Sequence, residues 1–131
     1  GGILGKRMFL RVEDLAISNL VPQVKPSETI TNVIIEISSK RLGATAVLEN
    51  DRLVGIITDG DLRRMIQKHP NYQNLTAGDV MTKSPKSIDK EELVVDALNI
   101  MREKNITQLP VTDHEKYRGV IHLHDILKEG I

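Results

Sequence analysis

Two aspartates stand where an apolar run meets a helical pattern, and they are the first candidates for chemistry in this sequence. Asp61 follows the run Gly55-Ile56-Ile57-Thr58, and Asp125 follows Gly119-Val120-Ile121-His122. The first turn of a helix offers free backbone N–H groups and the positive end of the helix dipole, which favour an anion such as phosphate. A carboxylate beside it can accept hydrogen bonds from the two vicinal hydroxyls of a ribose. Thr58 together with Asp61 therefore predicts a nucleotide site.

A second interpretation of the same spacing stays open. A threonine three residues before an acidic residue also forms a capping box, in which Thr58 and Asp61 only satisfy the helix start. The second copy has His122 where the first has Thr58, and it keeps Asp125. A carboxylate that lacks its capping partner favours a role in ligand binding.

Two arginines strengthen the first of the two places. Arg63 and Arg64 follow Asp61 and could neutralise phosphate charge, whereas Leu127 and Lys128 hold the equivalent positions in the second copy. The first copy is therefore the better nucleotide candidate. The alternative is that both arginines lie on a solvated helix face.

Two histidines near the second aspartate are candidates for a metal or a ligand. His122 and His124 are two residues apart at a strand end, so they could point to one side, but a metal would need a third ligand from elsewhere. We expect the pair to cap the helix or to contact a ligand, with binding that depends on pH near neutrality. No nucleophile with its base is visible. We therefore expect no catalytic residue and no bound metal in this chain.

The elements that position these residues are written twice. The offset between the two runs is 119 − 55 = 64, and it holds without a gap over the preceding apolar positions. Each copy predicts the order strand, helix, strand, strand, helix. We expect an α+β fold in which the two repeats pack sheet against sheet as a pseudo-two-fold pair, with equivalent clefts between them.

The local signals give bounds for these elements. Ser27 is the predicted cap of the first helix and Gly43 its end, and Asp89 with Glu92 is the predicted cap of the helix striped by Val94, Ala97, Leu98 and Met101. The predicted elements are a helix over Glu28–Arg41, strands over Thr45–Glu49 and Leu53–Thr58, a helix over Asp59–Lys68, strands over Gln108–Thr112 and Tyr117–His122, and a last helix from near His124. The predicted parts are a lead-in (1–18), the first repeat (19–68), a connection (69–80) and the second repeat (81–131).

Composition excludes several classes of partner. Of 131 residues, 40% are hydrophobic, and 18 basic residues balance 18 acidic ones, so no global field draws the chain to nucleic acid or to an anionic membrane. Aromatic residues are only 2% of the chain. It therefore lacks the aromatic side chains on which proteins that bind single-stranded nucleic acid stack the bases. Cysteine is absent, and no apolar run approaches the length of a membrane span. We expect a cytoplasmic protein.

The doubled unit resembles a pair of cystathionine-β-synthase (CBS) domains. That family is marked by a strand, Gly, two apolar residues, Thr or Ser, two variable residues and Asp, and the stretch from Gly55 to Asp61 matches it in full. The resemblance implies binding of an adenosine nucleotide or a related ligand between the repeats. By position, Asp61 and then Asp125 would contact ribose, and Thr58 would lie near phosphate. His122 departs from the pattern.

A narrower resemblance covers more of the chain. The segments Gly1–Arg7, Leu10–Val12, Leu42–Val47, Thr58–Arg64 and Ile121–Leu127 are similar to the C-terminal part of arabinose-5-phosphate isomerases. Those enzymes carry an N-terminal sugar-isomerase (SIS) domain that interconverts ribulose 5-phosphate and arabinose 5-phosphate, the first step towards Kdo, a sugar of lipopolysaccharide or capsule.

This second resemblance implies a regulatory function. The fragment would lack the catalytic domain and be inactive alone, it would need no cofactor, and it would sense an adenine nucleotide or CMP-Kdo. Its partners would be its own SIS domain and further copies of the chain, in a dimer or tetramer. The alternative is a module with empty clefts that only holds isomerase subunits together. A third possibility, a metal-dependent enzyme, would require metal bound at His122 and His124.

Overall fold

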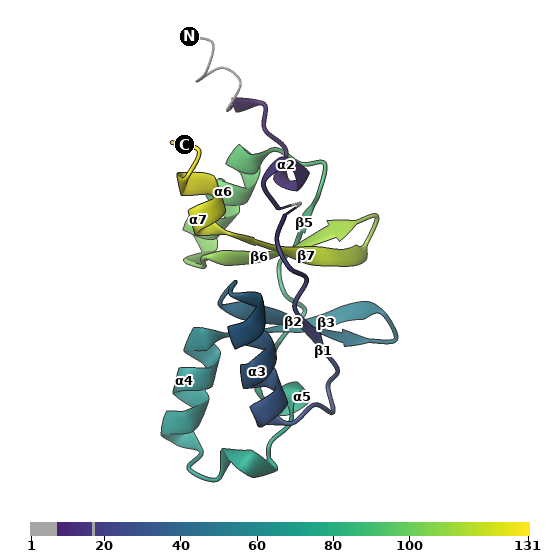
Figure 1. Cartoon of the computed structure of the whole chain (residues 1–131), viewed down its shortest axis with the longest axis vertical. Coiled ribbons are helices and arrows are strands. Elements are labelled where there is room, and N and C mark those ends of the chain that lie inside the picture. Colours follow the sequence, from purple (N-terminus) through teal and green to yellow (C-terminus); the bar gives the residue numbers. More distant parts are fainter. Residues whose placement is uncertain (1–7, 17) are drawn as a thin grey trace. The chain divides into compact units, whose positions relative to one another are not determined.

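The computed structural model describes residues 8–16 and 18–131, and the chain forms two compact units. The first repeat unit is Leu20–Pro85, and the second repeat unit combines the described residues up to Asn19 with Lys86–Ile131 (Figure 1). The residues before Asn19, from the predicted lead-in, therefore lie in the same unit as the last 46 residues (131 − 86 + 1). No helix among the described residues is long and apolar enough to cross a membrane.

The first repeat unit has a sheet with the strand order β1-β2-β3-β4. Strand β1 pairs with β2 in parallel, and the β2–β3 and β3–β4 pairs are antiparallel. Its elements are β1 (Gln23–Val24), α3 (Ile30–Lys40), β2 (Ala44–Glu49), β3 (Arg52–Thr58), α4 (Asp59–Lys68), the 3-10 helix η1 (Tyr72–Asn74), α5 (Ala77–Val80) and β4 (Thr82–Lys83).

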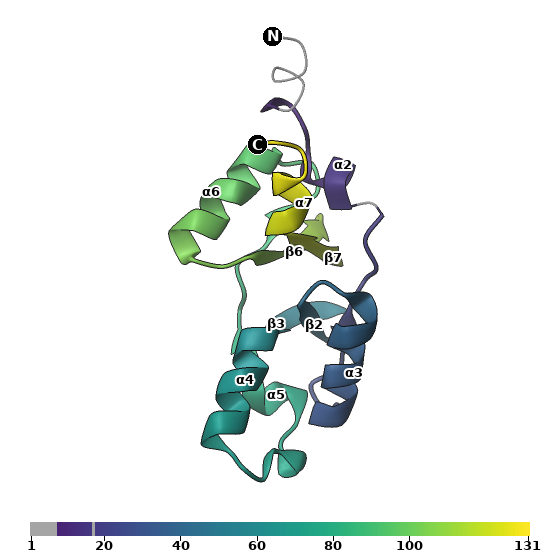
Figure 2. The same ribbon diagram turned by 60° about the vertical axis from the view of Figure 1, so that its left-hand side comes forward.

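The second repeat unit has the strand order β5-β6-β7, with a parallel pair followed by an antiparallel pair. Its elements are α2 (Val12–Ala16), β5 (Ile88–Asp89), α6 (Val94–Lys104), β6 (Gln108–Asp113), β7 (Lys116–His122) and α7 (Leu123–Leu127). Helices α3 and α4 cover one face of the sheet in the first unit, and α6 and α7 do so in the second (Figures 1 and 2). The predicted order of strand, helix, strand, strand, helix and the α+β class are confirmed in both repeats.

The hairpins show how closely the two copies agree. Asn50 and Asp51 turn the first hairpin with φ of 51° and 64°, and His114 and Glu115 turn the second with φ of 50° and 72°. Two successive residues at positive φ form the turn whose twist matches that of the flanking strands. Each hairpin also shifts register once, between Val47/Leu48 in the first and Val111/Thr112 in the second.

Two predicted helix caps are wrong. Thr29, not Ser27, caps α3, because its hydroxyl accepts a hydrogen bond from the N–H of Asn32 at 3.2 Å. Helix α6 begins only after Leu93, whereas Asp89 lies in strand β5 and its carboxylate accepts the N–H of Glu91 at 2.9 Å. Both helices start later than predicted because the residues before them are used in backbone pairing with another segment.

The first helix also ends earlier than the predicted Gly43. Arg41 already takes the left-handed conformation with φ of 63°, and its N–H returns to the carbonyl of Ile37. Asn105 ends α6 in the same conformation with φ of 54°. The predicted bounds of α4, Asp59–Lys68, are confirmed without change.

Each repeat unit encloses its own core. The predicted stripe on α6, Val94, Ala97, Leu98 and Met101, is wholly buried. On α3, Ile30, Val33 and Ile37 are buried and Ile34 packs against them from a half-buried position. The helical spacing of apolar residues therefore predicted the core faces correctly.

A short helix from another part of the chain completes each core. In the second unit, the N–H groups of Val12 and Glu13 donate to the carbonyls of Glu92 and Lys90, both at 2.9 Å. In the first unit, the N–H groups of Ala77 and Gly78 donate to Glu28 and Pro26 in the same way, at 2.9 and 2.8 Å. Val12 and Ala77 are both fully buried. The internal repeat thus extends to the segments that precede each copy, with an offset of 77 − 12 = 65.

Candidate functional site

Thr58 and Asp61 form a reciprocal cap at the junction of β3 and α4. The Thr58 hydroxyl accepts the N–H of Asp61 at 3.2 Å, and the Asp61 Oδ2 accepts the N–H of Thr58 at 2.9 Å. This is the capping-box interpretation of the spacing, and the structure shows it. The cap uses only one of the two carboxylate oxygens, so it leaves a second interaction open to Asp61.

The other oxygen of Asp61 faces a cation. Its Oδ1 accepts a hydrogen bond from Arg64 Nη2 at 2.7 Å. The Arg64 side chain is 63% exposed, and that of Asp61 is 18% exposed. An exposed ion pair within one helix contributes little to stability, so Arg64 can leave Asp61 for another partner. Arg63 is exposed on the same helix, and no contact described for it reaches the corner.

The second corner, at the junction of β7 and α7, is also capped, so the expectation that the histidine pair caps this helix is confirmed for His122 and another prediction is wrong. Asp125 was expected to lack a capping partner, but His122 Nδ1 accepts the N–H of His124 at 2.9 Å. In return, Asp125 Oδ2 accepts the N–H of His122 at 2.8 Å. An unprotonated imidazole nitrogen accepts a hydrogen bond as a threonine hydroxyl does. His122 therefore replaces Thr58 in function as well as in position.

The two histidines of this corner lie against each other. The rings of His122 and His124 stack with centroids 4.7 Å apart and planes at 9°. Burial, and then the charge of His124, lower the pKa of His122 below its ordinary value, while Asp125 acts in the opposite direction. The part of the chain that the structure describes has no group of three or more residues suited to hold a metal ion.

Asn19 is a residue of the second corner that the sequence did not reveal. Its Nδ2 donates to Asp125 Oδ2 at 3.0 Å and to the carbonyl of Val120 at 3.1 Å. It lies 106 positions from Asp125 in the sequence, and no local motif marks it.

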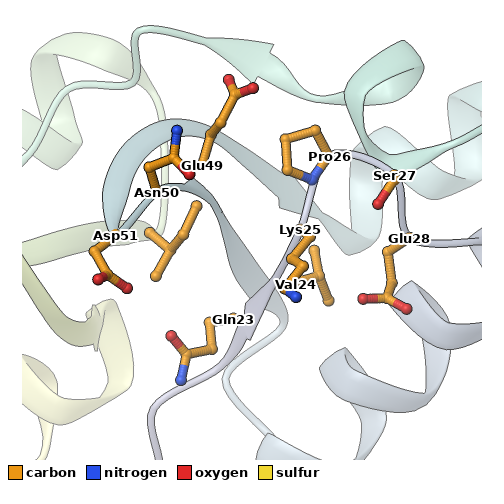
Figure 3. A pocket seen from close by; sticks show the side chains of 10 residues that line it. Gln23, Val24, Lys25, Pro26, Ser27, Glu28, Glu49, Asn50 and Asp51 are labelled. Carbon is orange, nitrogen blue, oxygen red and sulfur yellow. The ribbon is translucent and has the colours of Figure 1, made fainter.

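One concave region of the first repeat unit lies away from the corner of that unit. It has a volume of about 550 Å³ and opens between the start of α3 and the turn of the β2–β3 hairpin (Figure 3). Thr58 is at the opposite end of β3 from that turn. None of the seven predicted site residues belongs to its lining, which consists of Gln23, Val24, Lys25, Pro26, Ser27, Glu28, Leu48, Glu49, Asn50 and Asp51.

Comparison with known proteins places both corners in matched repeats. The CBS domain family pattern matches residues 12–68 and 77–131. Arabinose 5-phosphate isomerase KdsD of Francisella tularensis is 43% identical over 129 residues, which cover 97% of this chain and 39% of that protein. The chain spans about two fifths of the length of the curated relatives it matches.

Solved structures share the fold at lower identity. A CBS domain protein from Pyrobaculum aerophilum complexed with AMP superimposes with a TM-score of 0.80 at 22% identity, covering 92% of this chain and 97% of that one. The structure of CBSX2 in complex with AMP gives a TM-score of 0.77 at 21% identity, covering 92% and 95%. The chain therefore belongs to the CBS domain family as a tandem pair, and it matches the C-terminal CBS region of the KdsD arabinose 5-phosphate isomerases.

Proposed function

We propose that this chain is the regulatory, ligand-sensing part of a bacterial arabinose 5-phosphate isomerase and that it binds an adenine nucleotide or a nucleotide-activated sugar. The similarity to the isomerases, which extends over 97% of the chain, carries the proposal. The whole protein would interconvert ribulose 5-phosphate and arabinose 5-phosphate on the path to Kdo, for lipopolysaccharide or capsule. The end product in activated form, CMP-Kdo, is then a rational effector beside AMP and ATP.

The first corner has the chemistry that such a ligand needs. Asp61 Oδ2 is used by the cap, whereas Oδ1 carries only the exposed Arg64, which a pair of ribose hydroxyls can displace. Helix α4 is ten residues long, and its first turn supplies positive dipole and N–H groups for phosphate. Arg64, once released from Asp61, lies within one helical turn of that phosphate. Thr58, Asp61 and Arg64 are thus the central binding residues of the proposal, with Arg63 as an additional cation.

The predicted arrangement of the repeats supplies the regulation. A ligand that bridges the two repeats would bind more tightly to one relative orientation of them and would favour that orientation. The difference in binding free energy between the orientations would then act on the SIS domain. The free energy by which the ligand shifts the conformational equilibrium of the isomerase cannot exceed that difference in binding free energy. The regulatory partner of the chain is therefore its own SIS domain.

Calorimetric titration with AMP, ATP and CMP-Kdo tests the proposal. We expect at least one of them to bind, and Asp61→Asn to weaken that binding by about tenfold to a hundredfold, because a charged acceptor is replaced by a neutral one. Asp79→Asn is the matched control, since Asp79 caps α5 through the N–H of Thr76 at 2.8 Å but lies outside the corner. If none of the three ligands binds, or if both variants lose affinity equally, the sensing function is rejected.

An assembly function remains the second candidate because of two exposed isoleucines. Ile35 on α3 and Ile66 on α4 are 59% and 45% exposed, and both lie in the first repeat unit. Contiguous apolar patches mark contacts between subunits, and this function requires the two isoleucines to belong to such a patch. Light scattering would favour this function if the chain is a dimer or tetramer without ligand and Ile35→Asp with Ile66→Asp makes it monomeric.

A further inference from the structure

The two corners differ in the partners that hold their aspartates. In the first, Asp61 Oδ1 is paired with Arg64, an exposed side chain of the same helix, three residues away. In the second, Asp125 Oδ2 accepts two hydrogen bonds, from the N–H of His122 and from the side chain of Asn19. Asp125 is only 8% exposed. The capping oxygen of the second aspartate therefore has one partner more than that of the first, whereas its Oδ1 lies only near the exposed Lys128 Nζ, at 3.8 Å.

The orientation of the Asn19 amide is fixed by its partners. Both the carboxylate of Asp125 and the carbonyl of Val120 are acceptors, so the amide can only present its NH₂ group to them. Each of the two N–H bonds then has one acceptor. Loss of the Asp125 carboxylate as a partner would therefore leave one amide proton of Asn19 unpaired.

Asn19 also ends the segment that packs on the second repeat. At its other end, this segment is held by the N–H groups of Val12 and Glu13, which donate to Glu92 and Lys90 at 2.9 Å each. Between these ends Val12 is fully buried, and Leu15 and Ala16 pack against the same core. Displacement of Asn19 would thus remove the attachment that follows α2.

We propose that Asn19 is a positioning residue that fastens the lead-in segment to Asp125 and so holds that segment on the second repeat unit. The fastening stands on the contacts of the Asn19 side chain alone.

Hydrogen exchange tests the fastening without any ligand. In Asn19→Ala we expect the amides of Val12 and Glu13 to exchange about tenfold faster, because two hydrogen bonds that hold the segment are lost. The amides of Ala77 and Gly78, which make the equivalent bonds in the first unit, should not change. Asn99→Ala, at an exposed site on α6, is the control variant. Unchanged exchange at Val12 and Glu13 in Asn19→Ala would overturn the fastening.

A charge variant separates this contact from a general structural role. Asn19→Asp would place a second carboxylate against Asp125, and two carboxylates that share a site cannot both ionise without cost. We expect Asn19→Asp to have a lower melting temperature than Asn19→Ala at pH 7.5. The gap between the two melting temperatures should narrow near pH 4 to 5, where one of the two carboxylates takes a proton. A melting difference between the two variants that does not depend on pH would contradict a direct contact with Asp125.

Discussion

Among single residues, the glycine that opens the first corner motif is required by packing. Gly55 is buried in β3, and a Cβ added there would collide with the Met81 side chain, including its Cγ at 2.8 Å and its Cβ at 2.9 Å. The Cβ of Met81 is fixed to the backbone, so the collision cannot be relieved by a rotamer change alone. Gly60, five residues on, meets only the mobile end of Arg64 at 3.3 Å.

These two glycines should respond to alanine in opposite ways. We expect Gly55→Ala to lower the free energy of unfolding by about 1–3 kcal/mol through overpacking. Gly60→Ala should be neutral or stabilise by up to about 1 kcal/mol, because alanine favours the helical conformation more than glycine. Urea unfolding at 25 °C measures both. Equal stability of Gly55→Ala and the parent would show that β3 and Met81 can separate without cost.

At the scale of elements, the start of α7 depends on an imidazole. His122 Nδ1 accepts the N–H of His124 only while that nitrogen carries no proton. The neighbouring charged groups are His124 in the stack and Asp125 in the cap, and Lys128 lies 3.8 Å from Asp125. The folded pKa of His122 is lowered, so the unfolded chain binds the proton more readily. The contribution of His122 to stability therefore falls as pH drops below about 6.5 and is unaffected above it.

His122→Thr should remove this pH dependence and keep the cap. The variant restores the residue type of the first corner, whose hydroxyl caps α4 at any pH. We expect the variant to gain stability over the parent as pH falls from 7.5 to 5.5, measured by urea unfolding at both values. His114 has a raised pKa from its hydrogen bond to Asp113 and titrates in the opposite sense, but it is present in both proteins and cancels in the difference. If the difference in unfolding free energy between His122→Thr and the parent stays constant with pH, His122 is protonated in the folded state as easily as in the unfolded chain.

At the scale of the whole molecule, neither repeat is complete within its family-matched residues. The core of the first unit includes Ala77, and β4 pairs with β3 through Lys83 and Thr82, although the matched pattern stops at residue 68. The core of the second unit includes Val12, which is 74 residues before Lys86 (86 − 12), where the rest of that unit begins. The chain thus contributes one segment to each core from outside the repeat.

Two fragments of the first repeat unit test this dependence. We expect residues 20–85 to keep helical circular dichroism and a cooperative thermal transition, although a chain of this size is only marginally stable. Residues 20–68 should lack both, because they omit Ala77 from the core and leave β3 without its β4 partner. A cooperative transition in the shorter fragment would show that α5 and β4 are dispensable.

Local patterns predicted much of the fold. The 64-residue offset, the apolar stripes on α3 and α6 and the bounds of α4 all came from spacing, because burial of one helix face imposes a period on the sequence. The caps at Ser27 and Asp89 were wrong since capping signals are local, whereas the backbone there is taken by pairing with α5 and α2. Of the candidate site, the structure brings Thr58, Asp61 and Arg64 together and leaves Arg63 exposed apart from them, and ligand binding by these residues stays a prediction.

The amino-acid sequence by itself determined that one unit occurs twice and that each copy ends in an acidic helix start, because repeats and periods are properties of order along the chain. Tertiary structure decided how each aspartate is used. Arg64 reaches Asp61 within one helix turn, but Asn19 reaches Asp125 across 106 positions, and a contact of that kind exists only once the chain has folded. The two corners are alike in sequence and differ in partners, since hydrogen bonds depend on distance in space and not on distance along the chain.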